Sequence, residues 1–265
     1  MEITQSLTLN PVPSRHHERT PLQPRYDYDY GPDKPRDKDF SDASFQPPNE
    51  KTQKMSKQTL WLCRHGNRID FVDPTQKGLV DPHLSEDGIV QAKQTGERLR
   101  GEGIRHVFSS PFYRAVETAH YIAEALDLPI KIEHGACEWM NAFWFATQPV
   151  YQTPEALRER FPRVDVAYKP LVLPCHPETN PEMLARCAVT AKRLVEAFPE
   201  DMVIIGHGAS VSGLAEGFLG RKPGLSCCAV CALTKIVREN GEATLELNGD
   251  ASHLLEGEAH RGRMV

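Results

Sequence analysis

The stretch LWLCRHGNRID, residues 60–70, joins an apolar run to a cluster of basic side chains. Its first four residues are apolar and read as a buried strand. Arg64 and His65 follow directly, and Arg68 comes three residues after His65. Charged side chains at the end of a buried strand cost free energy unless they meet a group of opposite charge. The stretch therefore predicts a strand that ends at a site for an anion.

The sequence around this stretch predicts strands that alternate with helices. Strands are expected at 59–66, 106–110, 129–135 and 202–208, and a two-stranded hairpin is expected at 227–250 with its turn at Asn240 and Gly241. Helices are expected at 84–103 with Ser85 as cap, at 110–126 with Ser110 as cap and Pro111 in the first turn, and at 153–161, 180–198 and 209–220. These patterns predict an α/β fold with three layers, α/β/α, around a mostly parallel central sheet with an antiparallel edge strand.

Composition narrows the class of protein. The chain has 265 residues, 40% of them hydrophobic, and a formal net charge of −5. This mild charge argues against a general binder of nucleic acid or of anionic membranes. No apolar run is long enough to cross a bilayer, and the N-terminus lacks a secretory pattern. We expect a cytoplasmic protein whose cysteines are reduced and mostly buried: Cys63, Cys137, Cys175, Cys187, Cys227, Cys228 and Cys231.

Two segments need a separate interpretation: the N-terminal residues 1–55 and the cysteine run at 227–231. Residues 1–55 hold eight of the 21 prolines and few aliphatic residues, so we expect a disordered tail before a domain at 56–265. The run CCAVC at 227–231 contains a C-x-x-C motif, but no second cysteine pair with zinc-site spacing follows it. Because this run also reads as part of a strand, no metal site is expected.

Three further polar residues lie near expected strand ends. Arg114 falls in the first turn of a helix, where backbone N–H groups and the helix dipole favour an anion. His207 lies between two glycines after an apolar strand and could hold an anionic oxygen. Glu138 lies in an aromatic neighbourhood that would raise the pKa of its carboxyl group, so that it could donate a proton near neutral pH. Each pattern alone also fits an ordinary reading: a solvent-facing arginine, a core histidine or a loop glutamate.

His65 suits a nucleophile. Positive charge on both sides lowers the pKa of an imidazole and leaves it a nitrogen lone pair, and such a group can attack a phosphoryl group. Gly66, directly after His65, would let a ligand approach the backbone closely. Taken alone, the stretch also fits a surface turn with basic residues.

In their order along the chain, these residues resemble the histidine phosphatase superfamily, also called the phosphoglycerate mutase-like family. The resemblance covers about residue 60 to the C-terminus. It rests on five blocks: LCRHGNR, PHLSEDGIVQAKQTGERL, VFSSPFYRAVETA, EWM and VIIGHGAS. It implies a phosphoglycerate mutase-like fold and chemistry through a phosphohistidine, without a metal or a cofactor.

The resemblance also implies a role for each candidate residue. The implied catalytic residues are His65, Glu138 and His207. The implied phosphate-binding residues are Arg64, Asn67, Arg68 and Arg114. His65 would be the nucleophile, and Glu138 would act as general acid and then as general base. His207 would help the arginines to hold the phosphoryl oxygens, which carry the charge in phosphoryl transfer.

The sequence departs from the family pattern at Asn67, where many members have glutamate or glutamine. Mutases of the family usually continue as Gly-Glu-Ser or Gly-Glu-Thr after the histidine, so the departure favours a phosphatase. RHGNRID, EWM and the region from AYKPLVLP to ARC look closer to the phosphatase branch with RHGxR, which includes the ubiquitin-associated, SH3-containing suppressors of T-cell signalling. The sequence shows no such adaptor domains, so the partners of that branch are not carried over.

The sequence is therefore consistent with three functions. The first is a metal-independent phosphomonoester hydrolase that acts through phospho-His65. The second is a phosphoglycerate mutase-type phosphotransferase, which would share the phosphoenzyme. The third is a non-catalytic domain that binds a phospholigand or a protein. The expected partner is a small-molecule or protein phosphomonoester, without nucleic acid or membrane, and a homodimer is one option for the assembly.

Overall fold

A six-stranded sheet carries the fold. The computed structural model describes residues 57–224 and 229–255. The strands lie in the order β3-β2-β4-β1-β5-β6. Their bounds are β1 Gln58–Arg64, β2 His106–Ser109, β3 Ile130–Ile132, β4 Met202–Gly206, β5 Leu233–Glu239 and β6 Glu242–Asp250.

The first four strands in this order run parallel. β1 pairs with β4 from Leu60 opposite Met202 to Arg64 opposite Gly206, and β2 lies parallel to both β3 and β4. β5 runs antiparallel to β1 and forms a hairpin with β6. The predicted mostly parallel sheet with an antiparallel edge is confirmed.

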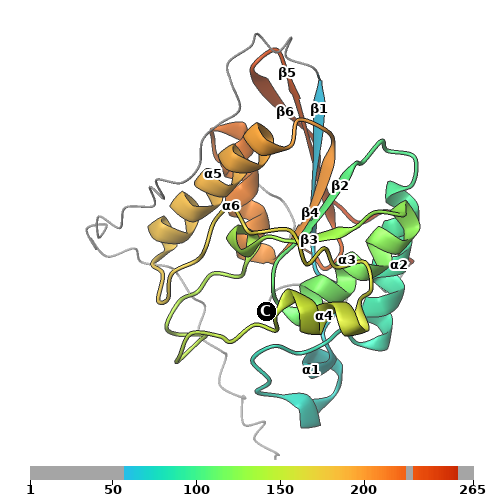
Figure 1. Ribbon diagram of the computed structural model, residues 1–265, viewed down its shortest axis with the longest axis vertical. Coiled ribbons are helices and arrows are strands. Elements are labelled where there is room, and N and C mark those ends of the chain that lie inside the picture. Colours follow the sequence, from blue (N-terminus) through green and yellow to red (C-terminus); the bar gives the residue numbers. More distant parts are fainter. Residues whose placement is uncertain (1–56, 225–228, 256–265) are drawn as a thin grey trace, which may run out of the picture. The chain divides into compact units, whose positions relative to one another are not determined.

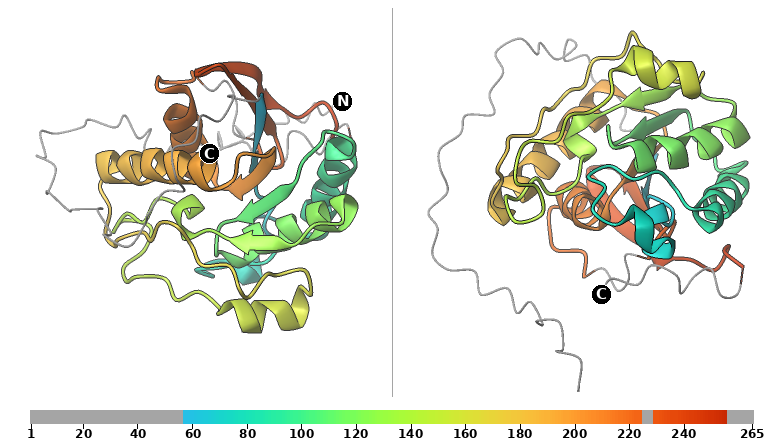
Figure 2. Two further views of the ribbon diagram at one scale, coloured as in Figure 1. Left: turned by 45° about the horizontal axis from the view of Figure 1, so that its top comes forward. Right: turned by 90° about the horizontal axis from the view of Figure 1, so that it is seen from below.

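Helices cover both faces of the sheet, as Figures 1 and 2 show. The longer helices are α2 Glu86–Leu99, α3 Tyr113–Leu126, α5 Asn180–Ala197 and α6 Gly208–Leu219. The shorter elements are α1 Ile69–Val72, η1 Pro74–Gln76, η2 His134–Ala136 and α4 Pro154–Arg160. Helices α2 and α3 lie on one face, and α5 and α6 lie on the other (Figure 1). The predicted three-layer fold is confirmed.

The alternation of side chains along β1 produces these layers. Successive residues of a strand point to opposite faces of the sheet. Trp61 and Cys63 pack in the core on the side of α2 and α3, whereas Leu60 and Leu62 pack in the core on the side of α5 and α6. All seven residues of β1 are buried. The strand that leads to His65 therefore lies at the centre of the fold.

The start of α3 differs from the prediction. Ser110 was expected to cap this helix and Pro111 to begin it, but the helix begins at Tyr113. The Ser110 hydroxyl instead lies 2.8 Å from Nε2 of His207. The Tyr113 N–H donates to Asp81, at 2.9 Å and 2.8 Å to its two carboxylate oxygens. A carboxylate from a distant loop thus replaces the local cap.

The cysteine run also differs from the prediction. The last strand pair begins at Leu233, and Cys231 lies in a turn with a positive φ of 55°. Cys227 and Cys228 lie outside the described residues, as does the whole predicted tail at 1–55. A hydrogen bond with Cys231, together with burial, holds the pKa of Cys63 well above its usual range. The described part of the chain has no helix long and apolar enough to cross a membrane.

Candidate functional site

His65 follows β1 at the carboxyl end of the parallel strands, the end shown from below in Figure 2. Its backbone N–H donates to the carbonyl oxygen of Gly206 in β4, at 3.0 Å. The ring nitrogen Nδ1 lies 2.8 Å from the carbonyl oxygen of Gly66. A carbonyl can only accept, so Nδ1 carries the proton in this contact and Nε2 keeps its lone pair.

The environment of His65 favours the neutral ring. The side chain is 1% exposed. Burial lowers the pKa of His65 well below its usual value, and the charges of Arg114, Arg64 and Arg68 lower it further. At neutral pH the ring therefore presents an unprotonated nitrogen. The sequence attributed this to positive charge alone, whereas burial is the larger cause in the structure.

Gly66 fits a close approach between backbones. A Cβ on Gly66 would lie 2.6 Å from the carbonyl oxygen of Gly88 in α2, and a Cβ on Gly88 would lie 2.1 Å from the carbonyl oxygen of Asn67. The loop also donates from Gly66 N–H to the hydroxyl of Thr118, at 3.0 Å. Gly66 thus allows the loop to pack closely against α2, and the expected approach of a ligand to its backbone stays a prediction.

Arg114 lies in the first turn of α3, as predicted, and is 2% exposed. One terminal nitrogen, Nη2, donates to Nδ1 of His207 at 3.1 Å and lies 3.8 Å from Oε2 of Glu138. The guanidinium lies 4.5 Å from the centre of the Phe112 ring. Burial lowers the pKa of Arg114 to about 10, so the side chain remains charged at neutral pH.

His207 carries its proton on the opposite nitrogen from His65. Because Arg114 can only donate, Nδ1 of His207 accepts and Nε2 carries the proton, which it donates to Ser110. The two rings meet edge to face, with centroids 5.2 Å apart. Burial, followed by the charge of Arg114, lowers the pKa of His207 well below its usual value. A neutral His207 thus links Arg114 to Ser110.

Glu138 faces this cluster and is 14% exposed at its side chain. Oε2 lies 3.5 Å from Nδ1 of His207, and Oε1 accepts from the backbone N–H of Trp139 at 3.0 Å. The expected aromatic neighbours are present but pack on each other, with the rings of Trp139 and Trp144 5.6 Å apart. The immediate contacts of the carboxylate are therefore polar.

The remaining predicted residues occupy the loop around His65. Arg64 ends β1 and is buried. Arg68 forms a two-point ion pair with Asp70, and its guanidinium lies 4.4 Å from the centre of the Phe71 ring. Asn67 is buried, and its side-chain NH2 donates to Asp87 at 2.8 Å. Its amide therefore points toward α2 in this structure.

Two groups of residues at the site gave no clear signal in the sequence. Asp81 contacts Arg114 at 3.4 Å across 33 positions of the chain. Arg186 contacts the carbonyl oxygen of Glu138 across 48 positions. Only the fold brings such pairs together. The sequence predicts Ser110 as a helix cap, whereas in the structure its hydroxyl contacts His207.

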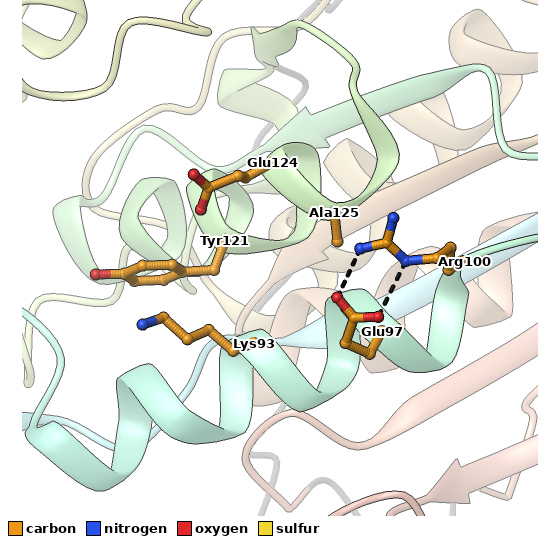
Figure 3. A pocket seen from close by; sticks show the side chains of 6 residues that line it. All are labelled: Lys93, Glu97, Arg100, Tyr121, Glu124 and Ala125. Carbon is orange, nitrogen blue, oxygen red and sulfur yellow. Dashed lines mark hydrogen bonds and ion pairs between the residues drawn. The ribbon is translucent and has the colours of Figure 1, made fainter.

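A separate hollow of about 260 Å³ lies between α2 and α3 (Figure 3). Its lining comprises Lys93, Glu97, Arg100, Tyr121, Glu124 and Ala125. The Arg100 guanidinium donates two hydrogen bonds to the carboxylate of Glu97. The Lys93 ammonium lies 5.1 Å from the centre of the Tyr121 ring. None of the candidate site residues lines this hollow. Within residues 57–224 and 229–255, no group of three or more His, Cys, Asp or Glu side chains is placed to hold a metal ion.

Comparison with protein families agrees with the fold and the motifs. The model of the histidine phosphatase superfamily (branch 1) matches residues 60–251. The chain belongs to this superfamily. The match begins at the first residue of the LWLCRHGNRID stretch and ends just after β6.

Curated proteins that match this chain are longer than it. The mouse ubiquitin-associated and SH3 domain-containing protein A is 35% identical over 157 residues, which cover 54% of this chain and 25% of that protein. The ecdysteroid-phosphate phosphatase of Bombyx mori is 29% identical over 219 residues, which cover 67% of this chain and 33% of that protein. The chain thus spans between a quarter and a third of the length of these relatives.

Solved structures of other phosphatases share the fold. The ecdysone phosphate phosphatase of Bombyx mori, in complex with tungstate, has a TM-score of 0.60 and 23% identity, and the match covers 72% of this chain and 93% of that one. A phosphoserine phosphatase from Entamoeba histolytica has a TM-score of 0.54 and 20% identity, and the match covers 75% of this chain and all of that one.

Proposed function

We propose that this chain is a phosphomonoester hydrolase in which Nε2 of His65 receives the phosphoryl group. The observation that carries the proposal is the state of this ring. Its proton is donated to the Gly66 carbonyl, burial and three arginines keep it neutral, and the lone pair of Nε2 is available. A phosphoryl group needs such a nucleophile together with nearby positive charge.

In the first step, the lone pair of Nε2 forms a bond to phosphorus. The bond from phosphorus to the ester oxygen breaks, and its electron pair stays on that oxygen. Glu138 supplies the proton that makes the leaving group a neutral alcohol. Its carboxylate oxygen already lies 3.5 Å from the His207 ring and 3.8 Å from Arg114, which supports a place beside the phosphoryl group.

In the second step, water attacks the phosphorus of the phosphohistidine. Glu138, now a carboxylate, accepts the proton of that water, and the bond from phosphorus to Nε2 breaks with its electron pair returning to the ring. The proton can stay on Nδ1, hydrogen-bonded to the Gly66 carbonyl, throughout, since neither step uses it. Arg64, Arg68 and Arg114 would bind the equatorial oxygens, whose charge persists through both steps. The reaction as proposed needs no metal.

Apolar side chains around the site favour an apolar leaving group. Ten large hydrophobic side chains are exposed in the described part of the chain, and seven of them lie on two segments, 71–80 and 143–150. The first segment follows Arg68 and the second follows Glu138, and both lie at the same end of the sheet (Figure 1). An apolar or aromatic substrate body would cover such a surface. Aryl phosphates should therefore be hydrolysed faster than small sugar phosphates, and equal rates would remove this preference.

The proposal is tested with a panel of phosphomonoesters, with and without EDTA, on wild type and on His65→Ala. The wild type should release phosphate in both conditions and should form an acid-labile phosphoenzyme, and His65→Ala should do neither. The control is His106→Ala, because His106 contacts Glu200 and none of the candidate site residues.

Two other outcomes would replace the proposal. Interconversion of 3- and 2-phosphoglycerate faster than phosphate release would indicate a mutase. Equal rates for wild type and His65→Ala would show that any activity is a contaminant and would favour a binding domain. The predicted partners, assembly and location of the protein stay predictions.

A further inference from the structure

Arg186 has an unusual set of contacts for a helix residue. It lies in α5, and its side chain is 0% exposed. Nε and Nη2 donate to the two carboxylate oxygens of Glu178, at 2.7 Å and 2.9 Å. The same guanidinium donates to three carbonyl groups of another segment: Gly135 at 2.6 Å, Cys137 at 3.3 Å and Glu138 at 3.2 Å. One arginine thus binds the backbone that leads into Glu138.

Glu178 holds the same segment from its far side. Its carboxylate accepts from the backbone N–H of Met140 at 3.2 Å, and its own N–H donates to the Met140 carbonyl at 2.9 Å. Its carbonyl oxygen accepts from the indole N–H of Trp139 at 3.0 Å. The backbone on both sides of Glu138 is therefore fixed by one ion pair.

A buried ion pair of this kind contributes little to the free energy of unfolding on its own. A buried ion pair loses hydration that its mutual attraction often fails to recover, and apolar residues of similar volume can replace such pairs without loss of stability. Here the pair is joined to backbone carbonyls that an apolar side chain could not satisfy. Its geometry fits the fixing of a backbone segment, and that segment carries the proposed general acid.

We propose that Arg186 is the positioning residue for Glu138. By holding the carbonyl groups of residues 135, 137 and 138, it fixes the direction in which the Glu138 carboxyl group points, toward His207 and Arg114. The inference rests on the proposed function, because it concerns the proton that Glu138 gives to the leaving oxygen. General acids of this kind contribute about 10²–10⁴-fold to a rate, and they do so only when correctly placed.

The dependence on the leaving group separates this role from a merely structural one. A nitrophenolate leaves readily without a proton, whereas an alkoxide needs one. Misplacement of Glu138 should therefore slow the hydrolysis of alkyl phosphates strongly and the hydrolysis of 2,4-dinitrophenyl phosphate weakly. General loss of folded protein would slow both equally.

The experiment compares kcat/KM for an alkyl phosphate and for 2,4-dinitrophenyl phosphate in the full chain. The test variant is Arg186→Met with Glu178→Gln, which removes both buried charges together. The reference is Glu138→Gln, and the control is Arg193→Met, on the same helix, whose guanidinium binds the Leu171 carbonyl. For the test variant, the ratio of the two kcat/KM values should move in the direction shown by Glu138→Gln, by about 10–100-fold. The control ratio should stay at the wild-type value.

A uniform decrease for both substrates would overturn the positioning role. So would a Glu138→Gln variant without any leaving-group dependence, because Glu138 would then not be the acid. If the double variant melts below the assay temperature, Arg186→Lys replaces it. A lysine keeps a charge beside Glu178 but lacks the guanidinium fork that reaches several acceptors at once. Failure of His65→Ala to abolish phosphoenzyme would instead overturn the proposed function itself, so the two failures are distinguishable.

Discussion

At the scale of single residues, the two histidines of the site are neutral and carry their protons on opposite nitrogens. His65 donates from Nδ1 to a carbonyl, and His207 accepts at Nδ1 from Arg114. We expect nitrogen NMR spectra of the two imidazoles to show the Nδ1–H form for His65 and the Nε2–H form for His207. Both rings should stay neutral as the pH falls through 6.5, because burial lowers both pKa values well below that value. A cationic ring at pH 6.5, or the same tautomer in both, would contradict this assignment.

Asp81 should weaken the binding of anions. Its carboxylate lies 3.4 Å from Arg114 and so offsets part of the charge available to a phosphate. We expect Asp81→Asn to strengthen inhibition by inorganic phosphate about three- to tenfold, because an amide keeps an acceptor for the Tyr113 N–H but removes the charge. The control is Asp73→Asn. Asp73 is an exposed carboxylate that accepts from Thr75 at the start of η1, and its substitution should leave phosphate inhibition unchanged. Weaker inhibition in Asp81→Asn would show that the hydrogen bonds from the Tyr113 N–H to Asp81 matter more than the charge of Asp81.

Sequence patterns could locate His65, Arg114, Glu138 and His207 because each lies close behind a strand of a parallel sheet. The structure brings these four side chains together. Asp81 could not be found in this way, since it lies in a loop and its partner lies on a helix whose start the sequence placed two residues too early. Contacts of this kind depend on the packing of loops, which has no local periodicity.

At the scale of elements, the contact between the His65 loop and α2 depends on two glycines. Gly88→Ala would place a Cβ 2.1 Å from the backbone oxygen of Asn67, and neither backbone can yield without moving the loop. We expect a loss of roughly 3 kcal/mol in the free energy of unfolding and at least a tenfold loss of activity. Denaturant unfolding and the phosphatase assay measure the two effects.

Val90→Ala provides the matched control on the same helix. Val90 is exposed, so its truncation should change the free energy of unfolding by no more than about 0.5 kcal/mol. A Gly88→Ala variant as stable and active as this control would show that the loop adapts. The sequence could predict α2 and its Ser85 cap, which the structure confirms, but it could not assign Gly66 to helix packing. That role depends on an element 22 positions away along the chain.

At the scale of the whole molecule, buried histidines couple stability to pH. Burial lowers the pKa of five described histidines: His65, His120, His134, His207 and His253. Below about pH 6.5 the unfolded chain binds protons at these side chains and the folded chain does not, so the free energy of unfolding should fall as the pH decreases. Each fully coupled histidine contributes up to about 1.4 kcal/mol per pH unit.

The comparison of wild type with His65→Asn isolates one such contribution. Between about pH 6.5 and 5.5, the variant should show a shallower decrease in the free energy of unfolding than the wild type. Urea unfolding at several pH values measures this slope. Equal slopes would mean that His65 is protonated in the folded protein. Asp81, Glu117 and Glu133, whose pKa values burial raises, act in the opposite direction, but they do so in both proteins.

The strand order also has a consequence for biosynthesis. β1 lies between β4 and β5 in the sheet. β1 ends at Arg64 and β4, the earlier of these two neighbours, begins at Met202, so both neighbours are synthesised at least 138 positions after β1. On the ribosome, the apolar residues of β1 therefore wait without their partners while more than half of the chain is synthesised, the situation in which nascent chains need chaperones. Protease protection of stalled nascent chains should appear only after β5 has emerged, and protection of chains that end before β4 would contradict this order of events.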